Sequence, residues 1–342
     1  MKALRIGTRD SQLAVWQATL VQDLLKQSGV ASELVYIKSE GDIDTITPLY
    51  ALGVQGIFTK TLDAALLNNR IDIAVHSMKD VPTQLAQGIQ QAAVLKRASY
   101  KDIFVAHPEA PFQLPRVGEA TQTLPSIDSA EFLEAHFSKP NAGGPSNQEG
   151  SGLGPIVATG SIRRVAQWLH RFPSHRTENL RGNVNTRLRK LKESNWAGAI
   201  FAAAGLERIN LRPENSIDLD WMLPAPSQGA IMIVCREGDT AAFESCQSFN
   251  DEATALCTKI EKDFLRVLMG GCSTPISALA EIKDGALYFH GNICSPDGVD
   301  LVEIKLEREK TKSETLGEEA ARQILALEKA QRIIQTVRNG KG

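Results

Sequence analysis

Residues 74–83 read AVHSMKDVPT, and this stretch decides how the first part of the chain folds. The apolar run IDIAVH at 71–76 predicts a strand, and the Val-Pro pair after Asp80 prevents a helix from beginning at once. Because Asn and Gly suffice for an ordinary turn, a histidine, a lysine and a carboxylate at a strand end indicate chemistry. An exposed ion pair of little energetic value is the simpler explanation for Lys79 beside Asp80. His76 is expected to be a packed or hydrogen-bonded residue of the strand.

The segments around this stretch alternate between strand and helix. Apolar patterns predict strands at 3–8, 33–39 and 71–76, and helices at 9–29 and 58–70. Such alternation indicates an α/β fold with a mostly parallel sheet that is covered on both faces. In sheets of this kind ligands bind beyond the carboxyl ends of the strands, which is where HSMKD lies.

A second set of similar units begins near 155–171, where a strand leads into a helix that Ser161 could cap. Its beginning is similar to IGTRDSQLA near the N-terminus, so we expect two related lobes that face each other across a cleft. Residues from about 251 onward predict a small third α/β domain with an antiparallel sheet. Residues 118–154 are rich in Gly, Ser, Pro and Asn, which predicts a long surface loop with one short helix at 128–137.

Composition limits the possible partners and the compartment. The chain has 342 residues, 42% apolar and 23% charged, with a formal net charge of −2, so bulk charge favours neither nucleic acid nor a membrane surface. The N-terminus lacks the pattern of a signal peptide, and runs such as 199–206 are too short to span a membrane, so a cytoplasmic protein is expected. Cysteines at wide spacing indicate reduced thiols, without a disulfide framework or a metal site: Cys235, Cys246, Cys257, Cys272 and Cys294.

Residues 161–190 hold seven Arg and one Lys against a single Glu. Arg163 and Arg164 follow the expected N-cap at Ser161, so guanidinium groups, backbone N–H groups and a helix dipole could converge on one anion. The same arrangement is expected for Arg181, Arg187 and Arg208. For any one arginine a solvated basic face is the alternative. RNA binding is a second alternative, which the scarcity of aromatic residues in the segment disfavours.

Three further positions carry functional hypotheses. Arg9 and Ser11 stand where the first strand meets the first helix, although a plain N-cap explains Ser11 equally well. Cys272 lies in LMGGCSTPI, where a covalent role and a small buried side chain both remain open. Asp80 could act as a general acid or stabilise a cation. At ~4 Å and an effective dielectric near ~20 the attraction would be roughly 4 kcal/mol, about a thousandfold in rate.

Together HSMKD, ATGSIRR, LRGN, AAAGLERI, LPAPSQGA and GGCSTPI, in this order, resemble the porphobilinogen deaminase (hydroxymethylbilane synthase) family of the haem pathway. The resemblance covers nearly the whole chain apart from 118–154. It implies a transferase with a dipyrromethane cofactor on Cys272 through a thioether bond. Four porphobilinogens are added head to tail, each losing ammonia to give a cationic azafulvene, and water releases 1-hydroxymethylbilane. Asp80 matches the family's catalytic carboxylate.

The resemblance further implies two lobes like type II periplasmic binding proteins, plus a small C-terminal α/β domain with an antiparallel three-stranded sheet. The domains would comprise 1–98 with 229–247, then 103–225, then 251–342. Because each pyrrole bears an acetate and a propionate, the arginines would bind a polycarboxylate. The implied cofactor-binding residues besides Cys272 are Lys79, Asp80, Thr159, Ser161, Arg163, Arg164, Arg187 and Arg208. The implied substrate-binding residues are Arg9, Ser11, Lys60, Arg181 and Gln228.

The family resemblance implies a monomer whose partners are porphobilinogen and the growing polypyrrole chain, with no metal, nucleic acid or membrane. One departure is Gln55, which stands where family members commonly carry a basic residue. A two-lobed binding protein for a polycarboxylate is the alternative; it would need the arginines but neither Asp80 nor Cys272. A cysteine-nucleophile hydrolase is disfavoured because no histidine is placed as its base.

Overall fold

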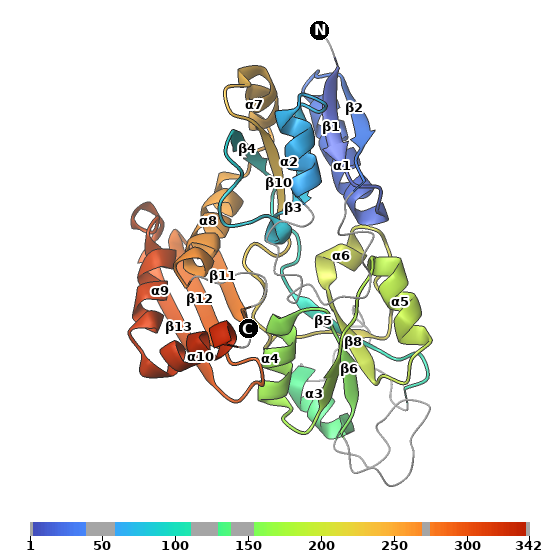
Figure 1. Ribbon diagram of the computed structural model, residues 1–342, viewed down its shortest axis with the longest axis vertical. Coiled ribbons are helices and arrows are strands. Elements are labelled where there is room, and N and C mark those ends of the chain that lie inside the picture. Colours follow the sequence, from blue (N-terminus) through green and yellow to red (C-terminus); the bar gives the residue numbers. More distant parts are fainter. Residues whose placement is uncertain (1–2, 39–58, 111–128, 138–153, 269–273, 340–342) are drawn as a thin grey trace.

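The computed structural model describes residues 3–38, 59–110, 129–137, 154–268 and 274–339. The described chain forms three β-sheets, each with its own helices (Figure 1). The first sheet lies at the top of Figure 1, the second at the lower right and the third at the left. This arrangement agrees with the expected α/β fold of two lobes and a C-terminal domain.

The first sheet has the strand order β2-β1-β3-β10-β4. Its strands are β1 (Leu4–Thr8), β2 (Ser32–Tyr36), β3 (Ile73–Ser77), β4 (Ile89–Val94) and β10 (Ile231–Arg236). β1 pairs in parallel with β2 and β3, whereas β10 runs antiparallel between β3 and β4. A strand from late in the chain therefore completes a sheet that is otherwise built from the first hundred residues.

Apolar side chains cover both faces of this sheet. Helices α1 (Gln12–Gln27) and α7 (Thr240–Gln247) pack against one face, where Val21 and Cys246 belong to the same buried cluster. Helix α2 (Lys60–Leu67) packs against the other face through a second buried cluster. The expected coverage of both faces is confirmed, and β3 is buried along its length so that its carboxyl end can present side chains to the cleft side.

The second sheet repeats this topology in the order β7-β6-β8-β5-β9. Its strands are β5 (Asp102–Ala106), β6 (Ile156–Ala158), β7 (Arg176–Glu178), β8 (Gly198–Ala202) and β9 (Ser216–Asp218). β6 pairs in parallel with β7 and β8, and the antiparallel β5 occupies the position that β10 has in the first sheet. The repeated order agrees with the expectation that the two lobes are related.

Helices again cover both faces of the second sheet. α3 (Ser129–Phe137) and α4 (Ile162–Arg171) pack on one face, and α5 (Val184–Lys192) and α6 (Ala203–Glu207) on the other. The expected short helix at 128–137 is confirmed by α3. The rest of the 118–154 segment lies outside the described residues up to 153.

The C-terminal domain contains an antiparallel three-stranded sheet, as expected, with helices packed against it through a buried cluster that includes Phe264 and Phe289. Its elements are α8 (Glu252–Val267), β11 (Ile276–Lys283), β12 (Ala286–Cys294), β13 (Leu301–Glu309), the 3₁₀ turn η3 (Lys310–Lys312), α9 (Leu316–Leu325) and α10 (Glu328–Asn339). Among the described helices, none is long and apolar enough to cross a membrane.

The chain crosses between the lobes at two segments, 95–101 and 219–230, and α8 is attached there. The carboxylate of Glu261 is fully buried and accepts hydrogen bonds from Arg97 (2.6 Å), from Ser227 N (2.6 Å) and from Ala280 N (2.7 Å). One acidic side chain thus joins both crossing segments to the C-terminal sheet.

Candidate active site

The end of β3 holds Lys79 and Asp80 at the lobe junction. A 3₁₀ turn, η2 (Met78–Asp80), follows the strand directly. Met78 N donates to Ala230 O (3.0 Å), and Val81 N donates back to Met78 O (3.2 Å), so backbone bonds fix the turn. Both polar side chains of the turn are partly buried, as the position at a strand end predicted.

Lys79 bonds to a glutamine at the crossing between the lobes. Its Nζ donates to Gln228 Oε1 at 3.3 Å. Burial lowers the pKa of Lys79 to about 8, although Asp80 and Asp102 act in the opposite direction. Because a buried cation close to other cations is held at a cost, an anion at this position would be strongly attracted.

A buried carboxylate organises the arginines of α4. Asp102, at the start of β5, is fully buried. Its Oδ2 accepts from Arg163 Nη2 (2.6 Å), and its Oδ1 accepts from Arg164 Nη2 (2.7 Å) and Gln228 Nε2 (2.8 Å). Burial alone would raise the pKa of Asp102, but the two guanidinium groups outweigh it and leave the pKa at about 2.

The same two arginines are interior residues. Arg163 is 5% exposed and Arg164 4%, so a solvated basic face is the wrong explanation for both. Their remaining bonds include Arg163 Nη1 to Leu223 O (2.7 Å) and Arg164 Nη1 to Ile200 O (3.0 Å). Arg163 Nε is buried without a hydrogen-bond partner among the described residues. Two cations share one carboxylate here, which leaves positive charge in excess.

Helix α5 adds another cation to the same field. Arg187 lies in its first turn, and Nε donates to Gly182 O at 2.7 Å. Burial lowers the pKa of Arg187 to about 10, Arg164 and Arg181 lower it further, and Asp80 opposes them. An electrostatic effect of Asp80 on Arg187 means that the strand end of the first lobe faces the arginines of the second.

The two serines expected as N-caps occupy those positions without capping through their side chains. Ser11 precedes α1 and Ser161 precedes α4, and neither side chain makes a cap hydrogen bond. Thr159 is buried beside Ser161, whose N–H lies 3.4 Å from Thr159 Oγ1. The N-terminal N–H groups of these helices therefore depend on another acceptor, which an anion can provide.

Arg208 and Arg9 extend the cationic lining toward the first lobe. Arg208 donates to Gly229 O at 2.7 Å, and its guanidinium lies 5.8 Å from the ring centre of Trp16. Burial lowers the pKa of Arg208 to about 10. Burial, together with Arg9 and Lys262, lowers the pKa of His76 to about 3, so His76 is a neutral packed residue, as expected.

The remaining predicted residues are placed differently. Lys60 is exposed at the beginning of α2. Gln228 is fully buried, and its amide donates to Tyr100 O (2.7 Å) and to Asp102, so protein groups use this side chain. Cys272 and Gln55 lie outside the described residues.

The other four cysteines are buried and unpaired, as expected: Cys235, Cys246, Cys257 and Cys294. Within the described ranges no group of acidic, histidine or cysteine side chains could hold a metal ion.

Three residues that the sequence did not single out belong to this region: Asp102, Glu261 and Lys262. Asp102 opens the apolar run DIFVA, and a lone acid at the start of a buried strand is the signal that could have identified a partner for buried arginines. Lys262 donates from α8 to Val81 O (3.0 Å) and Pro82 O (3.2 Å), next to Asp80. No local pattern marks it, because its role depends on the docking of α8.

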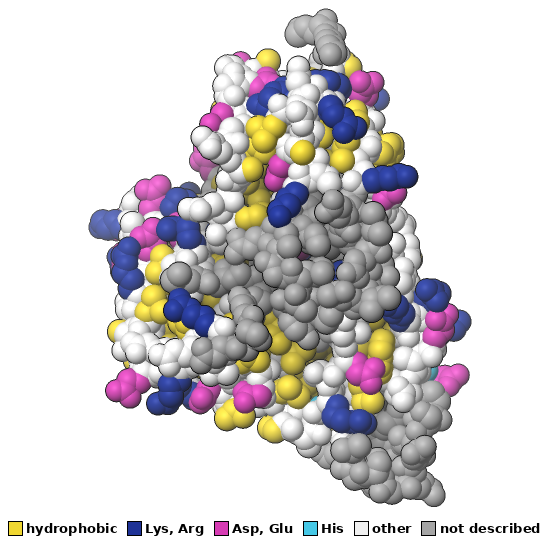
Figure 2. Space-filling model, viewed as in Figure 1, with side chains coloured by type: hydrophobic (Ala, Val, Ile, Leu, Met, Phe, Trp, Pro, Cys, Tyr) yellow, Lys and Arg dark blue, Asp and Glu magenta, His cyan; other side chains and the backbone are white. Residues whose placement is uncertain are grey.

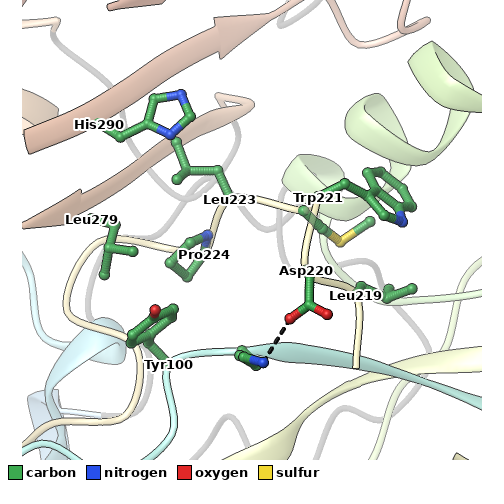
Figure 3. Close-up of a pocket in the computed structure, with 10 residues that line it drawn as sticks. Tyr100, Leu219, Asp220, Trp221, Leu223, Pro224, Leu279 and His290 are labelled. Atoms are coloured by element: carbon green, nitrogen blue, oxygen red, sulfur yellow. Dashed lines mark ion pairs between the residues drawn. The ribbon is translucent and has the colours of Figure 1, made fainter. Parts of the chain in front are cut away.

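A separate cavity of about 160 Å³ lies between the 95–101 crossing, the second lobe and the C-terminal sheet (Figure 3). Tyr100, Leu279 and His290 border it, and the ion pair between Lys101 and Asp220 (2.6 Å) lies at its edge. This cation is already neutralised, so the cavity does not compete with the arginine cluster as a polyanion site.

The outer surface does not compete either. On the described part of the face in Figure 2, acidic and basic side chains are interspersed, so the concentrated positive charge lies inside, around Asp102.

Comparison with protein-family models gave two matches that together cover most of the chain. Residues 4–244 match the model described as "Porphobilinogen deaminase, dipyromethane cofactor binding domain". Residues 255–326 match "Porphobilinogen deaminase, C-terminal domain".

Curated relatives carry the same name. The chain is 40% identical to the chloroplastic porphobilinogen deaminase of Oryza sativa subsp. japonica, covering 88% of this chain and 76% of the relative. It is 36% identical to porphobilinogen deaminase of Acidithiobacillus ferrooxidans, covering 98% and 99%.

Among solved structures, the VFT2 domain of Bordetella pertussis BvgS matches with a TM-score of 0.38 and 12% identity, covering 74% of this chain and 90% of that one. A Salmonella typhimurium periplasmic binding protein described as having high arginine specificity matches with a TM-score of 0.38 and 11% identity, covering 75% and 94%. The two-lobe description rests on the sheet topology and not on these scores.

Proposed function

This chain belongs to the porphobilinogen deaminase family, and from that premise we propose a reaction in which each residue of the site has a role. The enzyme, a transferase, condenses four porphobilinogen molecules head to tail with loss of ammonia and releases 1-hydroxymethylbilane by hydrolysis. The observation that carries the proposal is the position of Asp80, which faces Arg187 and the buried cluster of Arg163 and Arg164. One carboxylate stands opposite several cations, which suits a polycarboxylate that passes through a cationic intermediate.

The cation cluster fits a dipyrromethane with acetate and propionate side chains. Two guanidinium groups share the single carboxylate of Asp102, and Arg163 Nε is buried without a hydrogen-bond partner among the described residues. Burial and neighbouring cations lower the pKa of Arg187 to about 10, a cost that a bound carboxylate would relieve. When bound, the dipyrromethane supplies the free pyrrole α-carbon to which the incoming units are joined, and Cys272 is the attachment point that we assign to it.

Asp80 is the catalytic residue in this proposal. It gives a proton to the leaving amine of porphobilinogen, and as a carboxylate it then stabilises the positive charge that the departing ammonia leaves on the substrate. A cation at about 4 Å and an effective dielectric near 20 gains roughly 4 kcal/mol, which corresponds to about a thousandfold in rate. His76 does not share this work, because it is buried and neutral.

Hydrogen-bond donors from both lobes hold the carboxylates of the pyrroles. Lys79, with a pKa of about 8, binds anions while it is protonated. Arg163 and Arg164 contribute mainly through the field of their charges, because Asp102 occupies part of each guanidinium. We assign the dipyrromethane to Lys79, Thr159, Ser161, Arg163, Arg164, Arg187 and Arg208, and the incoming porphobilinogen to Arg9, Ser11, Lys60 and Arg181. Gln228 has a supporting role, since its amide links Lys79 to Asp102.

The proposal includes the domain division 1–98 with 229–247, 103–225 and 251–342, which the membership of β10 in the first sheet supports. It also includes a cytoplasmic monomer. The unpaired state of the four described cysteines supports a reducing compartment, whereas the Oryza sativa relative is named as chloroplastic.

The decisive experiment is the intact mass of the purified protein together with its turnover of porphobilinogen. We expect a mass excess equal to one dipyrromethane, which Cys272→Ser abolishes along with activity. A matched control is Cys257→Ser, because that cysteine is a buried thiol near the beginning of α8, far in sequence from the proposed attachment point. An active preparation with the mass of the bare chain would refute the covalent cofactor. A protein that binds polycarboxylates without turnover would favour the alternative of a two-lobed binding protein.

A further inference from the structure

Helix α8 of the C-terminal domain reaches the turn that carries Asp80 through one side chain. The ammonium of Lys262 donates to Val81 O at 3.0 Å and to Pro82 O at 3.2 Å, the two carbonyls that directly follow Asp80. Lys262 is only partly exposed, because the first lobe covers it. A side chain from a different domain therefore contacts the backbone next to the proposed catalytic carboxylate.

The chain around Asp80 is held differently on its two sides. Before Asp80, Met78 N donates to Ala230 O, which ties the turn to the sheet. After Asp80, Val81 N is used inside the turn by Met78 O, and Pro82 has no N–H to give. An external anchor on this side must therefore use carbonyl oxygens, and Lys262 uses two consecutive ones.

Helix α8 is itself fixed in place by the residue before Lys262. Glu261 is fully buried, and its carboxylate binds Arg97 at 2.6 Å and Ser227 N at 2.6 Å, both in the segments that cross between the lobes. Consecutive residues of one helix thus contact the lobe crossing and the Asp80 turn. α8 ends at Val267, five residues before Cys272 in the sequence.

From these contacts we propose that Lys262 is a positioning residue of the reaction: it holds the Asp80 turn against the helix that leads to Cys272, so that the carboxylate keeps its direction through successive additions. The inference rests on the proposed function, since it presupposes that Asp80 is catalytic. Lys262 itself need not touch substrate. Its two hydrogen bonds to backbone carbonyls fix the chain that carries Asp80.

The charge of Lys262 acts on the same region. Burial lowers its pKa to about 8, and Asp80 opposes that change, so the ammonium and the carboxylate attract each other. Lys262 and Arg9 both lower the pKa of His76, which places this cation within the field of the strand end. A neutral side chain of similar length would lose the hydrogen bonds and the attraction together.

Lys262→Met is the informative variant, studied in the cofactor-loaded full-length enzyme. We expect the mass of the loaded protein and KM for porphobilinogen to stay within about twofold of wild type, while kcat falls about tenfold to a hundredfold, the loss typical of a catalytic group misplaced by about 1 Å. Lys262→Arg should restore most of kcat, because a guanidinium can donate to both carbonyls.

The matched control is Lys259→Met on the same helix. Lys259 bonds to Asp263 at 2.9 Å with a side chain that is 54% exposed, and it does not contact the Asp80 turn in the described contacts. We expect kcat and KM to be unchanged. Equal losses in the two methionine variants would show that α8 is merely destabilised and would overturn the inference.

Other outcomes separate the inference from the proposed function. Normal kcat in Lys262→Met, in an enzyme that Asp80→Asn inactivates, would refute the positioning role and leave the proposed function intact. Absence of hydroxymethylbilane formation by the wild type would refute the proposed function instead. Failure of Lys262→Arg to recover activity, or loss of the cofactor mass in both Lys262 variants, would also contradict positioning, because either result assigns Lys262 to the assembly of the domain.

Discussion

Replacing Asp102 with Asn tests whether one buried carboxylate holds the arginine cluster together. The substitution keeps the shape of the side chain but removes the charge that Arg163 and Arg164 share through bonds of 2.6 and 2.7 Å. Removing one partner of a buried ion pair typically costs about 3–5 kcal/mol, because the remaining charges are uncompensated. With total stabilities of about 5–15 kcal/mol, Asp102→Asn should fold but unfold at a clearly lower urea concentration.

The pH dependence provides an independent measure of the same interaction. Burial raises the pKa of Asp102, yet the two arginines leave it at about 2, below the ordinary 3.8. A depressed carboxylate pKa contributes stability that is fully present above the unfolded pKa and is lost as pH falls through the folded one. At 1.36 kcal/mol per pKa unit this contribution is about 2 kcal/mol. The stability difference between wild type and Asp102→Asn should therefore be constant above about pH 5 and shrink between about pH 4 and pH 2.

Urea unfolding at a series of pH values measures both quantities. Asp220→Asn is the control, because Asp220 pairs with Lys101 at 2.6 Å but its side chain is 62% exposed, and exposed pairs contribute about 1 kcal/mol or less. Equal stability of wild type and Asp102→Asn at pH 7 would refute the reasoning. So would a difference that remains undiminished at pH 3.

Three further perturbations test other parts of the site. Asp80→Asn should keep the dipyrromethane mass and lose about a thousandfold in kcat, measured by porphobilinogen turnover; a near-normal rate removes Asp80 from the mechanism. Lys79→Met should raise KM with little change in kcat, and because the pKa of Lys79 is about 8, the wild-type KM should rise as pH increases through 8 while the variant's stays flat; a parallel rise in both would assign that titration elsewhere. Glu261→Gln should lower the free energy of unfolding by about 3–5 kcal/mol, because Arg97 keeps a buried charge without its carboxylate partner; unchanged urea unfolding would contradict this.

Local sequence patterns predicted the lobes but not how their sheets are completed. The strand at 71–76 and the helices on either side of it have clear periodicities, and the structure places them as β3, α1 and α2. β10 is inserted between β3 and β4 from more than a hundred residues away, and β5 enters the second sheet in the same way. Such pairing depends on chain crossings between lobes, and a hydrophobic period carries no information about which strand will be the neighbour.

The site shows the same division between local and distant information. Arg163 and Arg164 were identified because they are adjacent and follow a helix N-cap. Their partner Asp102 lies about sixty residues earlier and resembles an ordinary acid at the beginning of a strand. Gln228 was assigned to substrate, but its burial against Tyr100 and Asp102 became visible only with the crossing segments in place. Charge clusters are thus readable from sequence, whereas the groups that neutralise them are not.

The turn at the end of β3 explains why neighbouring residues of AVHSMKDVPT perform different tasks. A 3₁₀ turn has about three residues per turn, so consecutive side chains point about 120° apart. Met78 accordingly points into the core, where it is 2% exposed, and Lys79 points toward Gln228. Asp80 is left to face Arg187 and Lys262, whose pKa values both respond to its charge. Adjacency in sequence therefore does not make Lys79 the partner of Asp80: the turn directs the lysine to the lobe crossing and leaves the carboxylate facing the arginines of the opposite lobe.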